Sequence, residues 1–176
     1  RPDASRGRGR ELGVSLDGIE LISPDGVREL DRYAAELYAL RKHAGMTPEA
    51  AATTVRQPLY LGAFLVRSGA VDGFGGGSAN TTADTVRAGL QVVGIDEQMK
   101  TVTSFFLMLL PDRSMGEGGA FIFADCALIP DPSPRQLARI AVNAGRAARD
   151  LFGWTPRVAM LSFSKRAPLS EAFPPA

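Results

Sequence analysis

The chain has 176 residues, of which 45% are hydrophobic and 22% are charged, and its formal net charge is +1. This composition is typical of one globular domain with a sizeable core, and the near-neutral charge disfavours bulk binding to nucleic acid or an acidic membrane surface. No apolar run approaches a membrane span, and the single cysteine, Cys126, excludes an internal disulfide. With no secretory signal in its polar N-terminus, we expect a cytoplasmic protein without nucleic-acid or membrane partners.

The first 43 residues predict a strand and then a helix. Residues 18–22, GIELI, read as a short strand that ends in the turn SPDG. A helix follows over residues 27–43, and Arg41 continues its apolar stripe. A guanidinium on such a stripe needs a partner or water, or it packs its stem and leaves its head in solvent. His43 reads as a helix-end residue, and with no second histidine a metal site is poorly supported.

Apolar runs and caps predict the remaining elements. Thr47-Pro48-Glu49 is a typical helix start, and residues 59–68 form an apolar helix. Continuous runs of β-branched and aromatic residues favour strands buried on both faces of a sheet. The elements expected after residue 100 are strands at 101–110, 120–124 and 158–163, and a helix over 134–151 that Ser133 caps.

The alternation of helices with apolar strands predicts the α/β class with a largely parallel sheet. We find no internal repeat or linker, so we expect one domain over residues 1–176. Ligands of such sheets gather beyond the carboxyl ends of strands. Four polar residues follow predicted strands there: Asp72, Asp125, Ser162 and Ser164.

Residues 71–93 read VDGFGGGSANTTADTVRAGLQVV, with four glycines crowded at the start (73, 75, 76 and 77), then a polar run and a helical repeat. A strand, a glycine loop and a helix N-terminus together make an anion cradle. Arg87 lies in the first turns of that helix, where the macrodipole disfavours a cation, so a negative partner is indicated. Two other interpretations stay open. In the first, the glycines are a dinucleotide-binding fingerprint, which they match only loosely because Ser78 replaces the third glycine. In the second, they form a purely structural turn.

The same stretch resembles the D-G-x-x-x-G-A-x-H-[ST]-[ST]-x-D-T-x-R-P-A-x-Q segment of the phosphate acetyltransferase family. Three further segments resemble that family in the same order: ELYALRKHAGMT at 36–47, GAFIFADCALIPDPSPRQLARIA at 119–141, and PRVAMLSFS at 156–164. The departures are Asn80 where the family usually has histidine, Gly76 where serine is frequent, and Ala88 where proline is usual.

The resemblance implies an acyltransferase that moves an acetyl group reversibly between coenzyme A and inorganic phosphate. It implies Arg41 and Arg87 as catalytic residues that neutralise the leaving phosphate through bidentate guanidinium groups. The substrate-binding residues expected with them are Asn80, Thr81, Thr82, Ser162 and Ser164. No metal and no bound cofactor are expected. Coenzyme A, acetyl phosphate and phosphate are the small-molecule substrates, and a homo-oligomer is a further possibility.

The resemblance also implies a three-layer α/β/α fold that is part of a larger two-domain acyltransferase architecture. The family's first strand, its C-terminal part and its thiol base have no counterpart here, so we expect this chain alone to turn over substrate poorly or not at all. Two other functions stay open: a truncated, non-catalytic remnant that binds phosphate ligands, and a related phosphate butyryltransferase.

Overall fold

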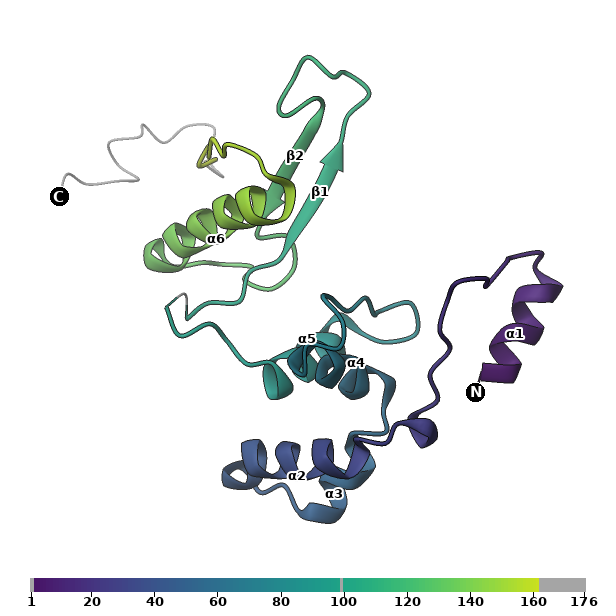
Figure 1. The fold of residues 1–176 in the computed structure, drawn as a ribbon. Helices are drawn as coiled ribbons and strands as arrows, with labels where there is room; N and C mark the ends of the chain where they lie inside the picture. The colour runs from purple at the N-terminus through teal and green to yellow at the C-terminus, as the bar shows by residue number, and fades with distance from the viewer. Residues whose placement is uncertain (1, 99, 162–176) are drawn as a thin grey trace. The chain divides into compact units, whose positions relative to one another are not determined.

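A computed structural model describes residues 2–98 and 100–161 (Figure 1). By its internal contacts the chain divides into two compact units, residues 1–94 and 95–176, and each is described by itself. Such units do not by themselves define folding domains, so a single domain over the whole chain stays a prediction.

The described part of the first unit consists of helices and loops. Thr47 caps α3 by accepting a hydrogen bond from the Ala50 N–H at 3.2 Å, as the Thr-Pro-Glu pattern predicts. The helices are α1 (Pro2–Glu11), α2 (Leu30–Arg41), α3 (Pro48–Thr54), α4 (Pro58–Arg67) and α5 (Thr82–Val92), with 3-10 turns at Pro24–Gly26 and Lys42–Ala44.

Two sequence-based expectations for this unit are wrong. Residues 18–22 form no strand, because they follow a turn and pair with no other segment of the described chain. No strand precedes the glycine loop either, since α4 ends at Arg67 and a turn leads directly into the loop.

The core of the first unit lies among α2, α3, α4 and α5. Phe64 of α4 is fully buried and stacks on Tyr33 of α2, with 4.8 Å between ring centroids. Ala88 and Val92 are the buried residues of α5. Arg67 donates a hydrogen bond to the Val92 carbonyl at 2.7 Å, so the end of α4 is joined to the end of α5. This packing fixes α5 and its N-terminus against α4.

The described part of the second unit contains a two-stranded sheet and one long helix. Strand β1 (Phe105–Leu109) pairs with β2 (Ala120–Ala124), and α6 (Pro134–Phe152) contacts β2. Ser133 and Gln136 form a capping box at the start of α6, as the sequence predicts from Ser133.

The sheet differs from the one expected. Its two strands are antiparallel, with Phe105 opposite Ala124 and Leu109 opposite Ala120. A short glycine-rich connection joins them as a hairpin, whereas parallel strands need a long crossover. Residues 158–161 form no strand, and 162–163 lie outside the described residues. These residues therefore show an α/β fold with a small antiparallel sheet, and neither a parallel sheet nor three layers.

Strand β1 is also less buried than its composition predicts. Phe106 is 57% exposed and Leu109 is 72% exposed, so the expectation of burial on both faces is wrong for the described chain. No helix among the described residues is long and apolar enough to cross a membrane.

Candidate functional site

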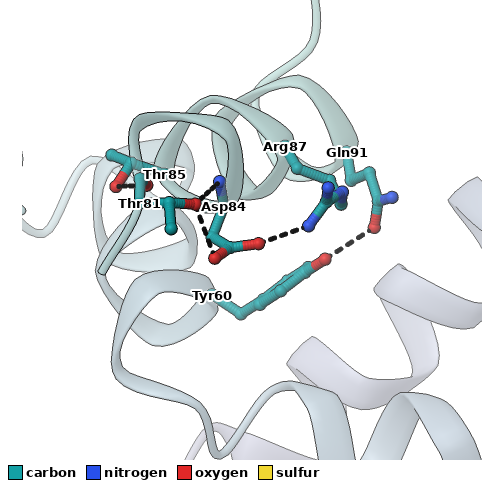
Figure 2. A network of polar contacts seen from close by, with 6 residues as sticks. All are labelled: Tyr60, Thr81, Asp84, Thr85, Arg87 and Gln91. Carbon is teal, nitrogen blue, oxygen red and sulfur yellow. Dashed lines mark hydrogen bonds and ion pairs between the residues drawn. The ribbon is translucent and has the colours of Figure 1, made fainter. Parts of the chain in front are cut away.

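The N-terminus of α5 is closed by a network that Thr81 and Asp84 share (Figure 2). The Thr81 hydroxyl accepts a hydrogen bond from the Asp84 N–H at 3.1 Å and donates one to Asp84 Oδ2 at 2.7 Å. Thr85 donates its hydroxyl to the Thr81 carbonyl at 3.1 Å. The hydrogen bonds from Thr81 and Arg87 lower the pKa of Asp84, so this carboxyl group is negatively charged at neutral pH.

Arg87 lies one turn further along α5 and pairs with the same carboxylate. Its Nη1 atom is 2.5 Å from Asp84 Oδ1. Both side chains are about half exposed, at 55% and 47%. The negative partner that the dipole argument required is therefore Asp84, within the same helix. A surface pair of this kind contributes only a few tenths of a kcal/mol to helix stability.

Tyr60 of α4 lies against this network from the neighbouring helix. The residue is only 9% exposed, and its hydroxyl donates a hydrogen bond to Gln91 Oε1 of α5 at 2.8 Å (Figure 2). Burial raises the pKa of Tyr60, whereas the positive charges of Arg87 and Arg41 act in the opposite direction. The charge of Asp84 also raises the pKa of Tyr60, so this phenol is influenced by the ion pair of α5 as well as by Arg41.

Arg41 reaches this position from the last residue of α2, which contacts α5. A cation at a helix C-terminus is favoured by the macrodipole. The side chain is half-buried, and within residues 2–98 and 100–161 it forms no hydrogen bond or ion pair. Arg41 is thus a partly desolvated cation that retains the capacity to bind an anion.

The glycine loop is held against α4 by an aromatic contact. A Cβ atom at Gly62 would lie 2.6 Å from Cδ2 of Phe74, so the absence of a side chain at Gly62 lets the Phe74 ring lie on the helix. Gly77 adopts a φ of +124°, a conformation that favours glycine, and its carbonyl accepts a hydrogen bond from the Asn80 N–H at 3.4 Å. The loop thereby leads to the start of α5.

The other candidate residues occupy varied positions. Asn80 and Thr82 are exposed at the start of α5. The hydroxyl of Thr81 donates its hydrogen bond to Asp84. Ser162 and Ser164 lie outside the described residues. Asp72 is exposed and follows no strand.

Asp125 follows β2 as expected, but its hydrogen bonds stabilise a loop. Its carboxylate accepts hydrogen bonds from the N–H groups of Ser104, Ala127 and Leu128, and from the Ser104 hydroxyl. Partial burial pushes the pKa of Asp125 upward, but the hydrogen bonds more than offset this, so the pKa lies below its ordinary value. A carboxylate stabilised in this way is a weak proton acceptor.

Sequence reasoning missed Tyr60, Gln91 and Gly62. Tyr60 and Gly62 lie in an apolar helix, where periodicity assigns any tyrosine to the core. The hydrogen bond from Tyr60 to Gln91 joins residues that are 31 positions apart in the sequence, and local spacing cannot reveal such a contact. The described residues contain no group of three or more His, Cys, Asp or Glu side chains that could hold a metal ion.

Comparison with known proteins gives a consistent result. The family model described as "Phosphate acetyl/butaryl transferase" matches residues 3–171. This chain belongs to that family. A phosphate acetyltransferase of Thermoanaerobacterium thermosaccharolyticum is 41% identical over 159 residues, which are 90% of this chain and 48% of the relative. The phosphate acetyltransferase of Clostridium acetobutylicum is 42% identical over 154 residues, 88% of this chain and 46% of the relative.

A solved structure agrees with the sequence matches. The EutD phosphotransacetylase from Staphylococcus aureus aligns with a TM-score of 0.76 and 31% identity, covering 94% of this chain and 48% of that one. The chain therefore spans about half the length of each of these three relatives.

Proposed function

We propose that this chain carries the phosphate-binding part of a phosphate acetyltransferase, which transfers an acetyl group reversibly between coenzyme A and inorganic phosphate. The observation that carries the proposal is the contact between α2, which ends at Arg41, and α5, which carries Arg87, so that the two arginines come from helices packed on each other. Asp84 already pairs with Arg87 in the ligand-free chain, so an incoming anion would share Arg87 with Asp84 and pair with Arg41. Membership of the family supports phosphate as the group concerned.

In the proposed reaction the thiolate of coenzyme A attacks the carbonyl carbon of acetyl phosphate. A thioester bond forms, the acyl C–O bond breaks and phosphate leaves with the electron pair. Arg41 and Arg87 would hold the phosphate and neutralise the charge that develops on it. An arginine suits this role because it stays protonated and presents two parallel donors. Removal of the thiol proton needs a base, and we assign none to the described residues.

The proposal includes the remaining substrate contacts. Asn80 and Thr82 would add donors at the start of α5, and Thr81 would do so once an anion displaces its hydrogen bond to Asp84. Ser162 and Ser164 belong to the same proposal by their match to the family motif. Coenzyme A acts as a substrate, with no bound cofactor. A three-layer parallel sheet, a two-domain architecture, a cytoplasmic location and homo-oligomerisation are further parts of the proposal for the whole protein.

Two other functions compete with this one. The family description includes butyryl transfer in its name, so a longer acyl group is one alternative. A non-catalytic protein that binds phosphate ligands is the other. In the proposal Arg41 and Arg87 bind phosphate, and no acyl pocket is identified. Both alternatives therefore predict the same phosphate site, and only the turnover of acetyl and butyryl phosphate distinguishes them.

The test measures acyl-coenzyme A formation from acetyl phosphate and from butyryl phosphate by the whole protein, beside phosphate binding by calorimetry. Faster turnover of acetyl phosphate is expected, and Arg87→Lys should lower it because lysine offers only a point charge. Arg56→Lys is the matched control, since Arg56 pairs with Asp25 at 2.7 Å on the exposed surface. Phosphate binding without turnover would favour the non-catalytic protein. Unchanged catalytic efficiency in Arg87→Lys would refute the role of Arg87.

A further inference from the structure

Tyr60 is a buried polar residue to which the proposed chemistry gives no task. The residue is 9% exposed, and the hydroxyl is the polar group of its side chain that needs a hydrogen-bond partner. Because Gln91 Oε1 can only accept, Tyr60 is the donor in the 2.8 Å hydrogen bond between them. This bond ties the first turn of α4 to the last turn of α5.

The hydroxyl lies where it can act on Arg87. Asp84, Arg87 and Gln91 follow one another along one side of α5, and Figure 2 shows Arg87 between the other two, above the Tyr60 ring. The Tyr60 proton points to Gln91, so the negative end of the O–H dipole remains for the nearby cations. The charges of Arg87 and Arg41 lower the pKa of Tyr60, whereas burial and the charge of Asp84 raise it.

We propose that Tyr60 is a positioning residue for Arg87, acting through its hydrogen bond to Gln91, which with Asp84 flanks Arg87 on α5. The hydroxyl does not contact substrate in this account. It restricts the guanidinium group to the space between Asp84 and Gln91, so that fewer conformations are lost when an anion binds. The effect on phosphate binding rests on the proposed function, whereas the effect on Arg87 itself does not.

The chain supplies a closely matched control. Tyr33 is another buried tyrosine, 3% exposed, and its hydroxyl donates to Ser68 Oγ at 3.2 Å. Tyr60→Phe and Tyr33→Phe therefore each remove one hydroxyl hydrogen bond from the same helical core. Only the first bond lies beside Arg87. Thermal unfolding followed by circular dichroism shows whether both variants stay folded.

The decisive readout is the Nε–Hε signal of Arg87 in the ligand-free chain, assigned by its loss in Arg87→Lys. Tyr60→Phe should move or broaden this signal and Tyr33→Phe should not. Gln91→Met should reproduce the effect, and the double variant with Tyr60→Phe should add nothing further. An Arg87 signal unchanged in Tyr60→Phe, or changed equally in both tyrosine variants, would overturn the proposal.

Phosphate titration separates this proposal from the proposed function. Tyr60→Phe should weaken inorganic phosphate binding by about twofold to tenfold, the range expected for one hydrogen bond, with Tyr33→Phe unchanged. If the wild-type chain binds no phosphate, the phosphate site is refuted, but the Arg87 signal still decides the role of Tyr60. Equal phosphate affinity in wild type and Tyr60→Phe would contradict the positioning role.

Discussion

Arg87 and Asp84 form an ion pair at the N-terminus of α5, with 2.5 Å between Nη1 and Oδ1. The carboxylate also accepts a hydrogen bond from the Thr81 hydroxyl at 2.7 Å. Asp84 thus occupies donors that the proposed phosphate would use. An incoming anion must displace this carboxylate or share Arg87 with it.

Asp84→Asn should therefore strengthen phosphate binding. The amide still accepts from Thr81, but the negative charge that pairs with Arg87 and repels an anion is gone. The repulsion between the Asp84 carboxylate and a phosphate bound nearby is about 1 kcal/mol in a solvated site. We therefore expect phosphate affinity to rise by roughly threefold to tenfold, measured by calorimetry with inorganic phosphate. A loss of affinity would mean that Asp84 mainly holds Arg87 in place.

Gly62→Ala should damage phosphate binding while leaving the helix intact. The new Cβ would lie 2.6 Å from Phe74 Cδ2, so the ring must move and the glycine loop with it. The better helix propensity of alanine offsets part of the strain, so we expect the free energy of unfolding to change by less than about 1 kcal/mol.

Gly89→Ala is the control for this substitution. Nothing lies within 4 Å of a Cβ at Gly89, also inside a helix. It should raise stability by about 0.5–1 kcal/mol and leave phosphate affinity unchanged. Equal phosphate affinity in Gly62→Ala and wild type would show that the loop position does not matter for the ligand.

Asp125→Asn should destabilise the second unit by about 1–3 kcal/mol at pH 7, because it weakens a cluster of partly buried hydrogen bonds. The folded-state pKa of Asp125 is lowered, so its contribution is present above the unfolded-state pKa and is lost as pH falls through the folded value. The difference between wild type and variant should therefore shrink below about pH 4.

The fluorescence of Trp154, the chain's single tryptophan, which stacks on Phe152, reports this unfolding. Asp112→Asn is the control, because Asp112 also accepts hydrogen bonds from a serine, Ser114, but is exposed. It should cost less than about 0.5 kcal/mol. A pH-independent difference for Asp125→Asn would show that shape, and not charge, matters at that position.

The helices after residue 27 were the most predictable part of this fold, because caps and periodicity are local signals, whereas α1 was not predicted. Thr81 and Ser133 each cap the helix that their sequence context indicates. The strands at 105–109 and 120–124 were predictable from apolar runs, but an apolar run does not encode the direction of pairing. The same runs predict burial, yet β1 is largely exposed in the described chain.

The candidate site divides in the same way. The unfavourable dipole position of Arg87 indicated a negative partner, and the local spacing made Asp84 available. The place of Tyr60 could not be predicted, because its partner lies in a different helix. The contact of α2 with α5, which brings Arg41 into the same helical unit as Arg87, likewise depends on tertiary packing.

The most direct test of the central claim is whether Arg41 and Arg87 bind one phosphate. Calorimetry with inorganic phosphate would compare wild type, Arg41→Gln, Arg87→Gln and the double variant. Arg32→Gln serves as the control, since Arg32 lies on α2 and pairs with Glu36 at 3.7 Å. We expect each single substitution at Arg41 or Arg87 to weaken binding by roughly tenfold to a hundredfold, and the double variant to lose less than the product because the two residues share a ligand. Unchanged affinity in both single variants, or fully multiplicative losses in the double variant, would contradict a shared phosphate site.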